Sequence, residues 1–148
     1  MATTVSKTTF ISKITETISI NKHHQQVETT LSIPNVTDYS HRIMSVSTGT
    51  SSIVILGAAD AAGTVDKTRF KYLRITNLDD ANNVRLSFVL ASGDTYEAVI
   101  SPKASHILTT KSGDITTGGA EVSLEDVAQI KGTATTAACD VELLTVAT

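Results

Sequence analysis

The feature that most constrains the fold is the alternation of apolar and polar residues in short runs. Val27, Leu31 and Ile33 alternate with polar residues such as Glu28. A repeat of two residues is the period of a β-strand with one buried face. Such runs recur at intervals of about 8–12 residues, which is typical of an all-β sandwich or barrel. No segment keeps the roughly 3.6-residue period of a helix over three turns.

The sequence predicts an all-β fold, an antiparallel β-sandwich of jelly-roll type with about 8–10 short strands. Ser123-Leu-Glu-Asp126 has the spacing of a capping box, so at most one helical turn is expected. Residues 1–9 predict a flexible N-terminal arm, and residues 10–148 predict a single β-sandwich domain. The expected strands lie within residues 10–20, 27–33, 42–46, 53–56, 69–76, 84–90, 96–100, 107–110, 127–131 and 139–146.

Two stretches are predicted to form pairs of strands. Phe10–Ile33 has a polar turn at residues 22–26 between its two apolar runs. Arg69–Leu90 consists of two apolar runs joined by residues 77–83, which are rich in the turn-forming residues Asn and Asp. The aromatic side chains expected in the core are Phe70, Tyr72 and Phe88.

The composition indicates which partners suit the chain. Charged residues make up 18% of the 148 residues, whereas there are 24 Thr and 15 Ser. Because Thr and Ser rather than Lys occupy the outward strand positions, we expect other chains to cover some edges or faces. Aromatic residues make up 4%, which argues against platforms for sugars or single-stranded nucleic acid. A net charge of −3 also disfavours nucleic-acid phosphates as partners.

The chain is expected to be a soluble protein that is made in a host cytoplasm. Its single cysteine, Cys139, cannot form an intrachain disulfide, which suits a reducing compartment. The N-terminal residues lack an apolar core of signal-peptide length. No apolar run approaches the roughly 20 residues that span a bilayer, so we expect no membrane partner.

Two polar stretches are candidate metal sites. His23 and His24 are adjacent, and on a turn both imidazoles can approach one ion. In a strand, however, they would point to opposite faces. Asp79–Asn83 is rich in oxygen ligands for calcium, but it lacks the sixth-position Gly and the closing Glu of an EF-hand loop. A solvated turn and a hairpin turn are the favoured interpretations.

Four acidic residues near one another in the sequence are candidates for catalysis. A pair of them could act in glycoside hydrolysis, but such an enzyme also needs aromatic sugar platforms. Short runs of carboxylates more commonly form a solvated surface, which is the favoured interpretation. The four residues are Asp114, Glu121, Glu125 and Asp126.

Cys139 is the remaining candidate nucleophile. It would need a positioned base, and nothing local links it to His41 or His106. A small buried thiol is the favoured interpretation. Gly57–Gly63 lacks the Lys-Ser/Thr ending of a phosphate-binding loop. We therefore predict no catalytic, cofactor-binding or metal-binding residues and no cofactor.

A succession of five segments carries a family resemblance. They are Tyr72-Leu-Arg-Ile-Thr-Asn-Leu78, Val84-Arg-Leu86, Gly93-Asp-Thr-Tyr96, Ser101-Pro-Lys-Ala-Ser-His-Ile-Leu108 and Cys139-Asp-Val-Glu-Leu143. The order of strand, Asn-rich turn, strand, Pro-containing turn and strand resembles small β-sandwich virion proteins of tailed bacteriophages. The resemblance begins at about residue 69 and lies in the strands and turns rather than in a diagnostic motif.

The resemblance implies a non-enzymatic structural protein of the virion, most specifically a capsid cement or decoration protein. The implied partners are further copies of the chain, as a homo-oligomer such as a trimer, and other virion proteins such as the major capsid protein or tail subunits. The arm and the loops at residues 58–68 and 111–119 are expected to make these contacts. The alternative is a tail, neck or fibre-associated structural or receptor-binding module. A hydrolase is a further hypothesis, and it requires a buried pair with perturbed pKa values in a cleft.

Overall fold

The computed structural model describes residues 6–58, 62–109, 115–117, 120–122 and 127–148. The described residues form strands and loops, and they contain no helix, which confirms the all-β prediction. The chain divides into two compact units, residues 1–37 with Thr148, and residues 38–147. Residues 10–37 therefore group with the first unit, whereas the sequence places them in the sandwich. The single helical turn expected at residues 123–126 lies outside the described residues.

The first unit is a long antiparallel hairpin. Strand β1 (Thr8–Ile20) pairs with β2 (His23–Val36) along almost its whole length. Asn21 and Lys22 form a two-residue turn, and their φ angles are 50° and 68°. Positive φ at both positions defines the type I′ turn, whose twist matches that of a hairpin. The predicted hairpin is thus confirmed, although its turn is shorter than the expected residues 22–26.

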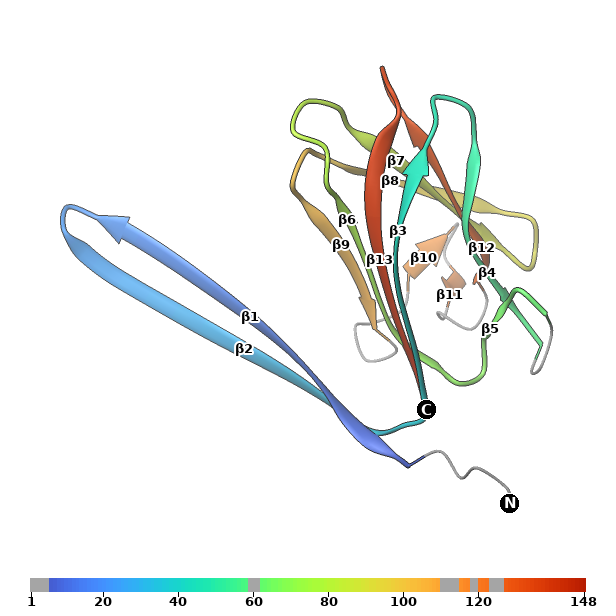
Figure 1. Ribbon diagram of the computed structural model, residues 1–148, viewed down its shortest axis with the longest axis horizontal. Helices are drawn as coiled ribbons and strands as arrows, with labels where there is room; N and C mark the ends of the chain where they lie inside the picture. Colours follow the sequence, from blue (N-terminus) through green and yellow to red (C-terminus); the bar gives the residue numbers. More distant parts are fainter. Residues whose placement is uncertain (1–5, 59–61, 110–114, 118–119, 123–126) are drawn as a thin grey trace. The chain divides into compact units, whose positions relative to one another are not determined.

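The second unit is a sandwich of two sheets (Figure 1). Its longer strands are β3 (Asp38–Val46), β4 (Ser51–Gly57), β6 (Phe70–Asn77), β7 (Val84–Leu90), β8 (Thr95–Ile100), β9 (Ser105–Thr109), β12 (Val127–Ala134) and β13 (Cys139–Ala147). The short strands are β5 (Val65–Asp66), β10 (Ile115–Thr117) and β11 (Ala120–Val122). One sheet has the order β3-β13-β6-β9, and the other has the order β5-β4-β12-β7-β8.

The strand order identifies the sandwich as a jelly roll. If the eight longer strands are numbered in chain order, one sheet runs 1-8-3-6 and the other runs 2-7-4-5. The first strand pairs with the last, the second with the seventh, the third with the sixth and the fourth with the fifth. This is the pattern of one long antiparallel ribbon that has been rolled into two sheets. The predicted jelly-roll sandwich is confirmed.

The rolled topology corrects the prediction for Arg69–Leu90. Strands β6 and β7 do not pair, because β6 belongs to the sheet of β13 and β7 to the sheet of β12. The loop between them crosses from one sheet to the other. Local patterns show where a chain reverses but not which sheet the next strand joins, since that depends on distant pairs such as β3 with β13.

The core lies between the two sheets. It contains Phe70 and Phe88, which are 1% and 0% exposed, together with aliphatic side chains from both sheets. Tyr72 is also buried, at 2%, but it is not part of this core cluster. The pairing of β6 with β13 skips one residue, Lys71, between Phe70 and Tyr72. An extra residue reverses the alternation of a strand, so Phe70 and Tyr72 face opposite sides of the sheet.

A second bulge explains the apolar run in β4. The pairing with β12 skips Ile53, and as a result both Ile53 and its neighbour Val54 reach the core. Ile55 is 43% exposed, so one side of this apolar run reaches solvent. Gly132 on β12 leaves room for Ile53, because a Cβ atom there would lie 2.7 Å from Ile53 Cδ1.

Candidate assembly surface

The hairpin has one apolar face and one polar face. In the β1–β2 pairing Ile18 lies opposite Gln25, and Glu16 lies opposite Val27. Paired residues share a face of the ribbon, and alternate residues along each strand share that face too. One face therefore collects most of the apolar side chains of both strands. These are Phe10, Ile14, Ile18, Ile20, Val27, Leu31 and Ile33.

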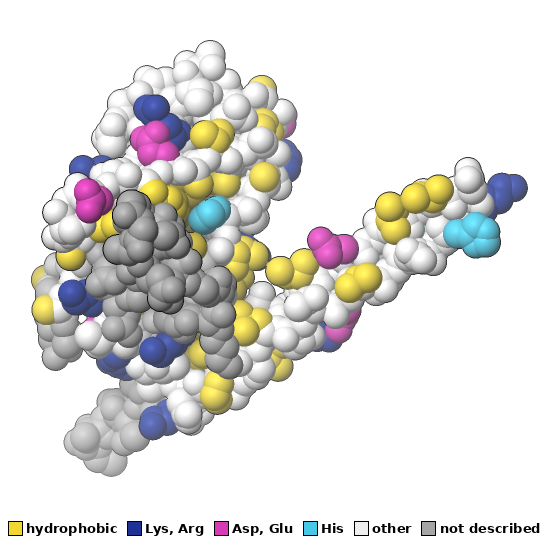
Figure 2. All heavy atoms as spheres, turned by 180° about the vertical axis from the view of Figure 1, so that it is seen from behind, with side chains coloured by type: hydrophobic (Ala, Val, Ile, Leu, Met, Phe, Trp, Pro, Cys, Tyr) yellow, Lys and Arg dark blue, Asp and Glu magenta, His cyan; other side chains and the backbone are white. Residues whose placement is uncertain are grey.

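The apolar face is open to solvent towards the turn of the hairpin. Ile14, Ile18 and Ile20 are 45%, 52% and 59% exposed, and Val27 is 59% exposed. Figure 2 shows hydrophobic side chains along this hairpin. The sequence predicts that Val27 lies in a half-buried strand. Strand β2 has the predicted alternation, but the apolar side chain of Val27 is exposed to solvent. Contiguous exposed apolar surface on a soluble chain is typical of an interaction site.

The apolar face is hollowed near the turn. A shallow pocket of about 250 Å³ is lined by Ile18, Ile20, Asn21, His23 and Gln25. Four of these residues share the apolar face, and Asn21 belongs to the turn. A concave apolar surface can receive side chains of a partner, which flat or convex apolar surface does less well.

The opposite face of the hairpin is polar. It carries Lys13 and Glu28, whose side chains form an ion pair of 3.0 Å. Both side chains are largely exposed, so the pair adds little to stability. Ile11 is the apolar exception on this face, at 57% exposed. The two faces of the ribbon therefore differ in polarity, because apolar side chains gather on one face and polar side chains on the other.

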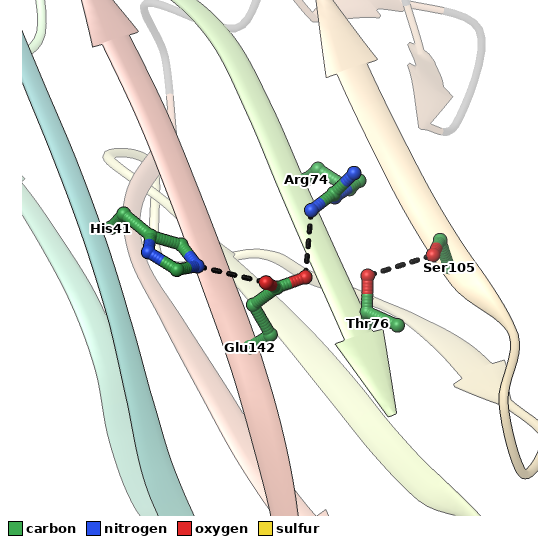
Figure 3. Close-up of polar contacts among 5 residues, drawn as sticks. All are labelled: His41, Arg74, Thr76, Ser105 and Glu142. Carbon is green, nitrogen blue, oxygen red and sulfur yellow. Dashed lines mark hydrogen bonds and ion pairs between the residues drawn. The ribbon is translucent and has the colours of Figure 1, made fainter. Parts of the chain in front are cut away.

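The outer face of the β3-β13-β6-β9 sheet carries a polar cluster (Figure 3). The Arg74 guanidinium donates a hydrogen bond of 2.6 Å to one carboxylate oxygen of Glu142, and His41 Nε2 lies 2.8 Å from the other. The hydrogen bond with His41 and the charge of Arg74 hold the pKa of Glu142 below its usual value. The cluster ties together the adjacent strands β3, β13 and β6.

The polar cluster does not form a catalytic triad. The Ser105 hydroxyl lies 2.8 Å from the Thr76 hydroxyl rather than beside the imidazole of His41. A serine nucleophile needs a base within hydrogen-bond reach, and the imidazole of His41 is turned to Glu142 on a different part of the sheet. The contacts are those of cross-strand pairs that stabilise a sheet surface.

The predicted histidine pair is in a strand rather than on a turn. His23 and His24 are the first two residues of β2, and they lie opposite Ile20 and Ser19. Adjacent strand residues point to opposite faces, so the two imidazoles do not converge on one ion. No group of three His, Cys, Asp or Glu side chains within the described ranges could hold a metal.

Asp79 organises the loop between β6 and β7. Its Oδ1 accepts hydrogen bonds of 2.7 and 2.6 Å from the backbone N–H groups of Ala81 and Asn82. The bond from Asn82, followed by that from Ala81, lowers the pKa of Asp79. The side chain of Lys103 donates to the carbonyl of Leu78 in the same loop. The predicted turn chemistry is present, and it serves a connection between sheets.

The candidate nucleophile Cys139 is buried, at 1% exposed. Burial raises the pKa of its thiol, and the nearby charge of Asp79 raises it further. The raised pKa keeps the sulfur protonated. The sulfur lies 3.9 and 3.4 Å from two backbone carbonyl oxygens, to which it can donate.

His106 lies elsewhere, beside the ring of Phe88, and the two ring centroids are 5.4 Å apart. The ring of Tyr96 stacks on the same Phe88 ring, with centroids 4.3 Å apart.

Most of the predicted acidic cluster lies outside the described residues. Asp114, Glu125 and Asp126 lie outside the described residues, and Glu121 is in the short strand β11. The predicted loop at residues 111–119 contains the short strand β10, and the loop at residues 58–68 contains β5. Gly57 is the last residue of β4 and packs closely against Thr64. A Cβ atom at position 57 would lie only 2.9 Å from Thr64 Oγ1. Its role is close packing of the chain.

A small pocket opens between the sheets beside β3. It has a volume of about 270 Å³, and its lining includes Asp38, Ser40 and Arg42 of β3 and Thr145 of β13. The guanidinium of Arg42 donates to the carbonyl of Ile53 across the sandwich.

No helix in the described part of the chain is long and apolar enough to cross a bilayer.

Comparisons with family models, with curated proteins and with solved structures find no match to this chain. Its function must therefore be inferred from the residues and the fold. Sequence reasoning found the alternation in β1 and β2 but not the exposure of their apolar face. The signal in the sequence was the alternation itself. Once β1 and β2 pair, it places the apolar residues of both strands on the same face of the hairpin.

Proposed function

We propose that the chain is a structural protein of a virus particle, and more specifically a cement or decoration protein of its shell. The flexible arm predicted at residues 1–9 lies largely outside the described residues, and its last two residues belong to β1. In this proposal the hairpin β1–β2 (Thr8–Val36), called the arm from here on, packs its apolar face on a neighbouring subunit. The observation that carries the proposal is the row of Ile14, Ile18, Ile20 and Val27, each between 45% and 59% exposed. Two-stranded hairpins in water are marginal, so a partner layer would also stabilise the arm.

The energy of one arm contact suits an assembly with many contacts. Full burial of a half-exposed isoleucine or valine contributes on the order of 1 kcal/mol. Two facing arms, with four such side chains each, then contribute on the order of 8 kcal/mol, against an association cost of roughly 4–15 kcal/mol. A single contact is marginal by this comparison. Repeated contacts in a particle would act together and hold each subunit firmly.

The neighbouring subunit is another copy of the same chain. Glu16 is the one carboxylate on the apolar face, and His23 is the one imidazole there. Two arms that pack face to face in opposite directions, centred on Ile18, would bring each Glu16 near the partner's His23. Arms packed in the same direction would instead bring like carboxylates together, which is unfavourable.

The sandwich supports the same proposal by analogy. Jelly rolls occur in viral capsid proteins and also in lectin domains, and a fold alone does not determine function. The resemblance of the strand and turn pattern to phage virion proteins adds to the analogy. In the proposal, the assembled chains coat a shell built from other subunits, such as a major capsid protein.

The test is to look for the chain in purified particles of the virus that encodes it. Mass spectrometry of the particles should detect the chain, and cryo-electron microscopy should place it at regular positions on the shell. Density on the tail, neck or fibre would support the alternative virion location instead. Absence of the chain from particles that are complete and infectious would refute a structural role.

A further inference from the structure

Strand β3 forms an open edge of the sandwich. It has nine residues, and its described pairing is with β13 on one side only. The other outer strands are shorter, with six residues in β8, five in β9 and two in β5. Residues Asp38 to Ile43 are exposed one after another, on both faces of the strand. Tyr39 and Ile43 are 72% and 61% exposed, so large apolar groups flank this edge.

The edge of β3 lacks most of the devices that prevent pairing with other chains. Edge strands are commonly protected by Lys, Pro, a bulge, short length or inward-pointing charges. The inward charges of β3 are Asp38 and Arg42, which are opposite in sign and can therefore pair with each other across two copies. Strand β3 contains neither Lys nor Pro. Its pairing with β13 runs from Asp38 to Val46 without a register shift. A long and regular edge is the kind that accepts an added strand.

We propose that β3 of a second copy of the chain pairs with this edge in an antiparallel manner, so that the two sheets join across a two-fold axis. Opposed residues of an antiparallel pair lie on the same face. The axis must therefore pass through a residue rather than between two residues. When it passes through Ser40, Asp38 lies opposite the partner's Arg42, and the same contact occurs twice.

Charge favours the register centred on Ser40 over its neighbours. A shift of the axis to Arg42 would oppose two guanidinium groups, which is unfavourable. A shift to His41 would oppose two imidazoles and leave Asp38 opposite the partner's Met44. The Ser40 register also covers the pocket that Asp38, Ser40 and Arg42 line. The opposed pairs from Asp38 to Arg42 belong to the second unit alone, so the arm contributes none of them.

A charge exchange tests the contact. Asp38→Arg places two arginines in opposition, and Arg42→Glu places two acidic groups in opposition. Each variant alone should sediment with at least a tenfold weaker dimerisation than the parent chain. An equimolar mixture should recover the dimer, since the arginine introduced at position 38 of one variant then meets the glutamate introduced at position 42 of the other. The second charge pair of this mixed dimer is the original pair of Asp38 and Arg42. If the mixture fails to recover the dimer, the proposal is overturned.

A disulfide provides a second test that does not depend on Arg42 being replaceable. Cys139 is buried, so Ser40→Cys introduces the accessible thiol. Under mild oxidation this variant should form a covalent dimer within minutes. Ser105→Cys, on β9 at the opposite edge of the same sheet, is the matched control and should remain uncoupled. Equal coupling of both variants would show that collision, not the proposed pairing, brings the thiols together.

Both tests are done with the full chain and also with Ile14→Thr and Ile18→Thr in the arm. Dimerisation through β3 should persist when the arm is made polar. A dimer that disappears with the arm substitutions would overturn the β3 contact and leave the arm as the sole self-association surface. A dimer that persists in the variant with the polar arm supports the β3 contact. This result would stand even if the chain proved to be absent from virus particles.

Discussion

Asn77 is the residue on which the crossing between the sheets depends. It is fully buried, and its side-chain nitrogen donates to the carbonyls of Asn82 and Ile100 at 2.8 and 3.3 Å. Its side-chain oxygen accepts a hydrogen bond of 3.1 Å from the backbone N–H of Asp79. A buried polar group that loses its partner costs free energy, because water cannot replace the lost bond.

We therefore expect Asn77→Ala to lower the free energy of unfolding by about 2–3 kcal/mol. The control is Asn83→Ala, in the same loop, where the described bonds to Thr135 use the backbone carbonyl of Asn83. This control should change stability by less than about 0.5 kcal/mol. Urea denaturation measures both variants, and equal losses would contradict the role assigned to the Asn77 side chain.

His106 gives the stability of the sandwich a dependence on pH. Burial lowers the pKa of its imidazole from the usual value of 6.5, and its buried Nε2 has no hydrogen-bond partner among the residues that the structure describes. The unfolded chain then binds a proton more readily than the folded chain, so stability falls as pH drops through and below about 6.5. The contribution of His106 to stability should be constant above that range.

The pH effect is checked by comparing His106→Gln with the wild type between about pH 7.5 and pH 5. The difference in unfolding free energy between them should change in favour of the variant as the pH falls. His24→Gln, in the exposed part of β2, is the control for the loss of an imidazole. A difference that is the same at both ends of this range would show that His106 does not cause the effect.

Single residues also explain where sequence prediction stops. The burial of Phe70 and Phe88 could be predicted, because aromatic side chains in apolar runs are usually core. The opposite orientation of Tyr72 could not, because it depends on the extra residue Lys71. A bulge is set by how two strands fit, and neither strand shows it alone.

At the scale of elements, the turn of the hairpin offers a direct test of the arm. Lys22 has a φ of 68°, a conformation that costs an L-residue free energy and that glycine adopts readily. Lys22→Gly creates the favoured Asn-Gly turn and should stabilise the hairpin by roughly 0.5–1 kcal/mol. Hydrogen exchange of the β1 and β2 amides should slow by about two- to fivefold.

The control for the turn is Lys13→Gly, in the middle of β1. Glycine there weakens a strand and also removes the ion pair with Glu28, so exchange should become faster. If both glycine variants changed exchange in the same direction, the type I′ turn would not limit the stability of the hairpin. The sequence predicted this hairpin well, since its strands pair next to each other in the chain.

At the scale of the whole molecule, the sequence predicted the jelly-roll class of fold but did not show which strands pair with one another. Alternation and spacing predict many short strands, and the jelly roll contains them. Its pairs β3–β13 and β4–β12 join residues far apart in the chain, and no local pattern encodes such pairs. The open edge of β3 follows from that topology. The composition predicted that some edges or faces are covered by other chains, but it identified neither this edge nor the apolar face of the hairpin.

The proposed assembly combines two contacts, one through the arm and one through β3. A chain that has a β3 contact alone can form only a dimer, because that contact is two-fold symmetric and closed. A chain with both contacts can extend into larger assemblies. The two surfaces therefore make different predictions about mass, and the arm decides whether assembly continues beyond the dimer.

The most direct test of the arm is the mass of the purified chain in sedimentation experiments. The wild type should form species larger than a dimer, whereas the variant with Ile14→Thr and Ile18→Thr should be no larger than a dimer. Ser19→Thr, on the polar face of β1, is the control and should assemble as the wild type does. A polar-arm variant with the same mass distribution as the wild type would contradict the role of the arm.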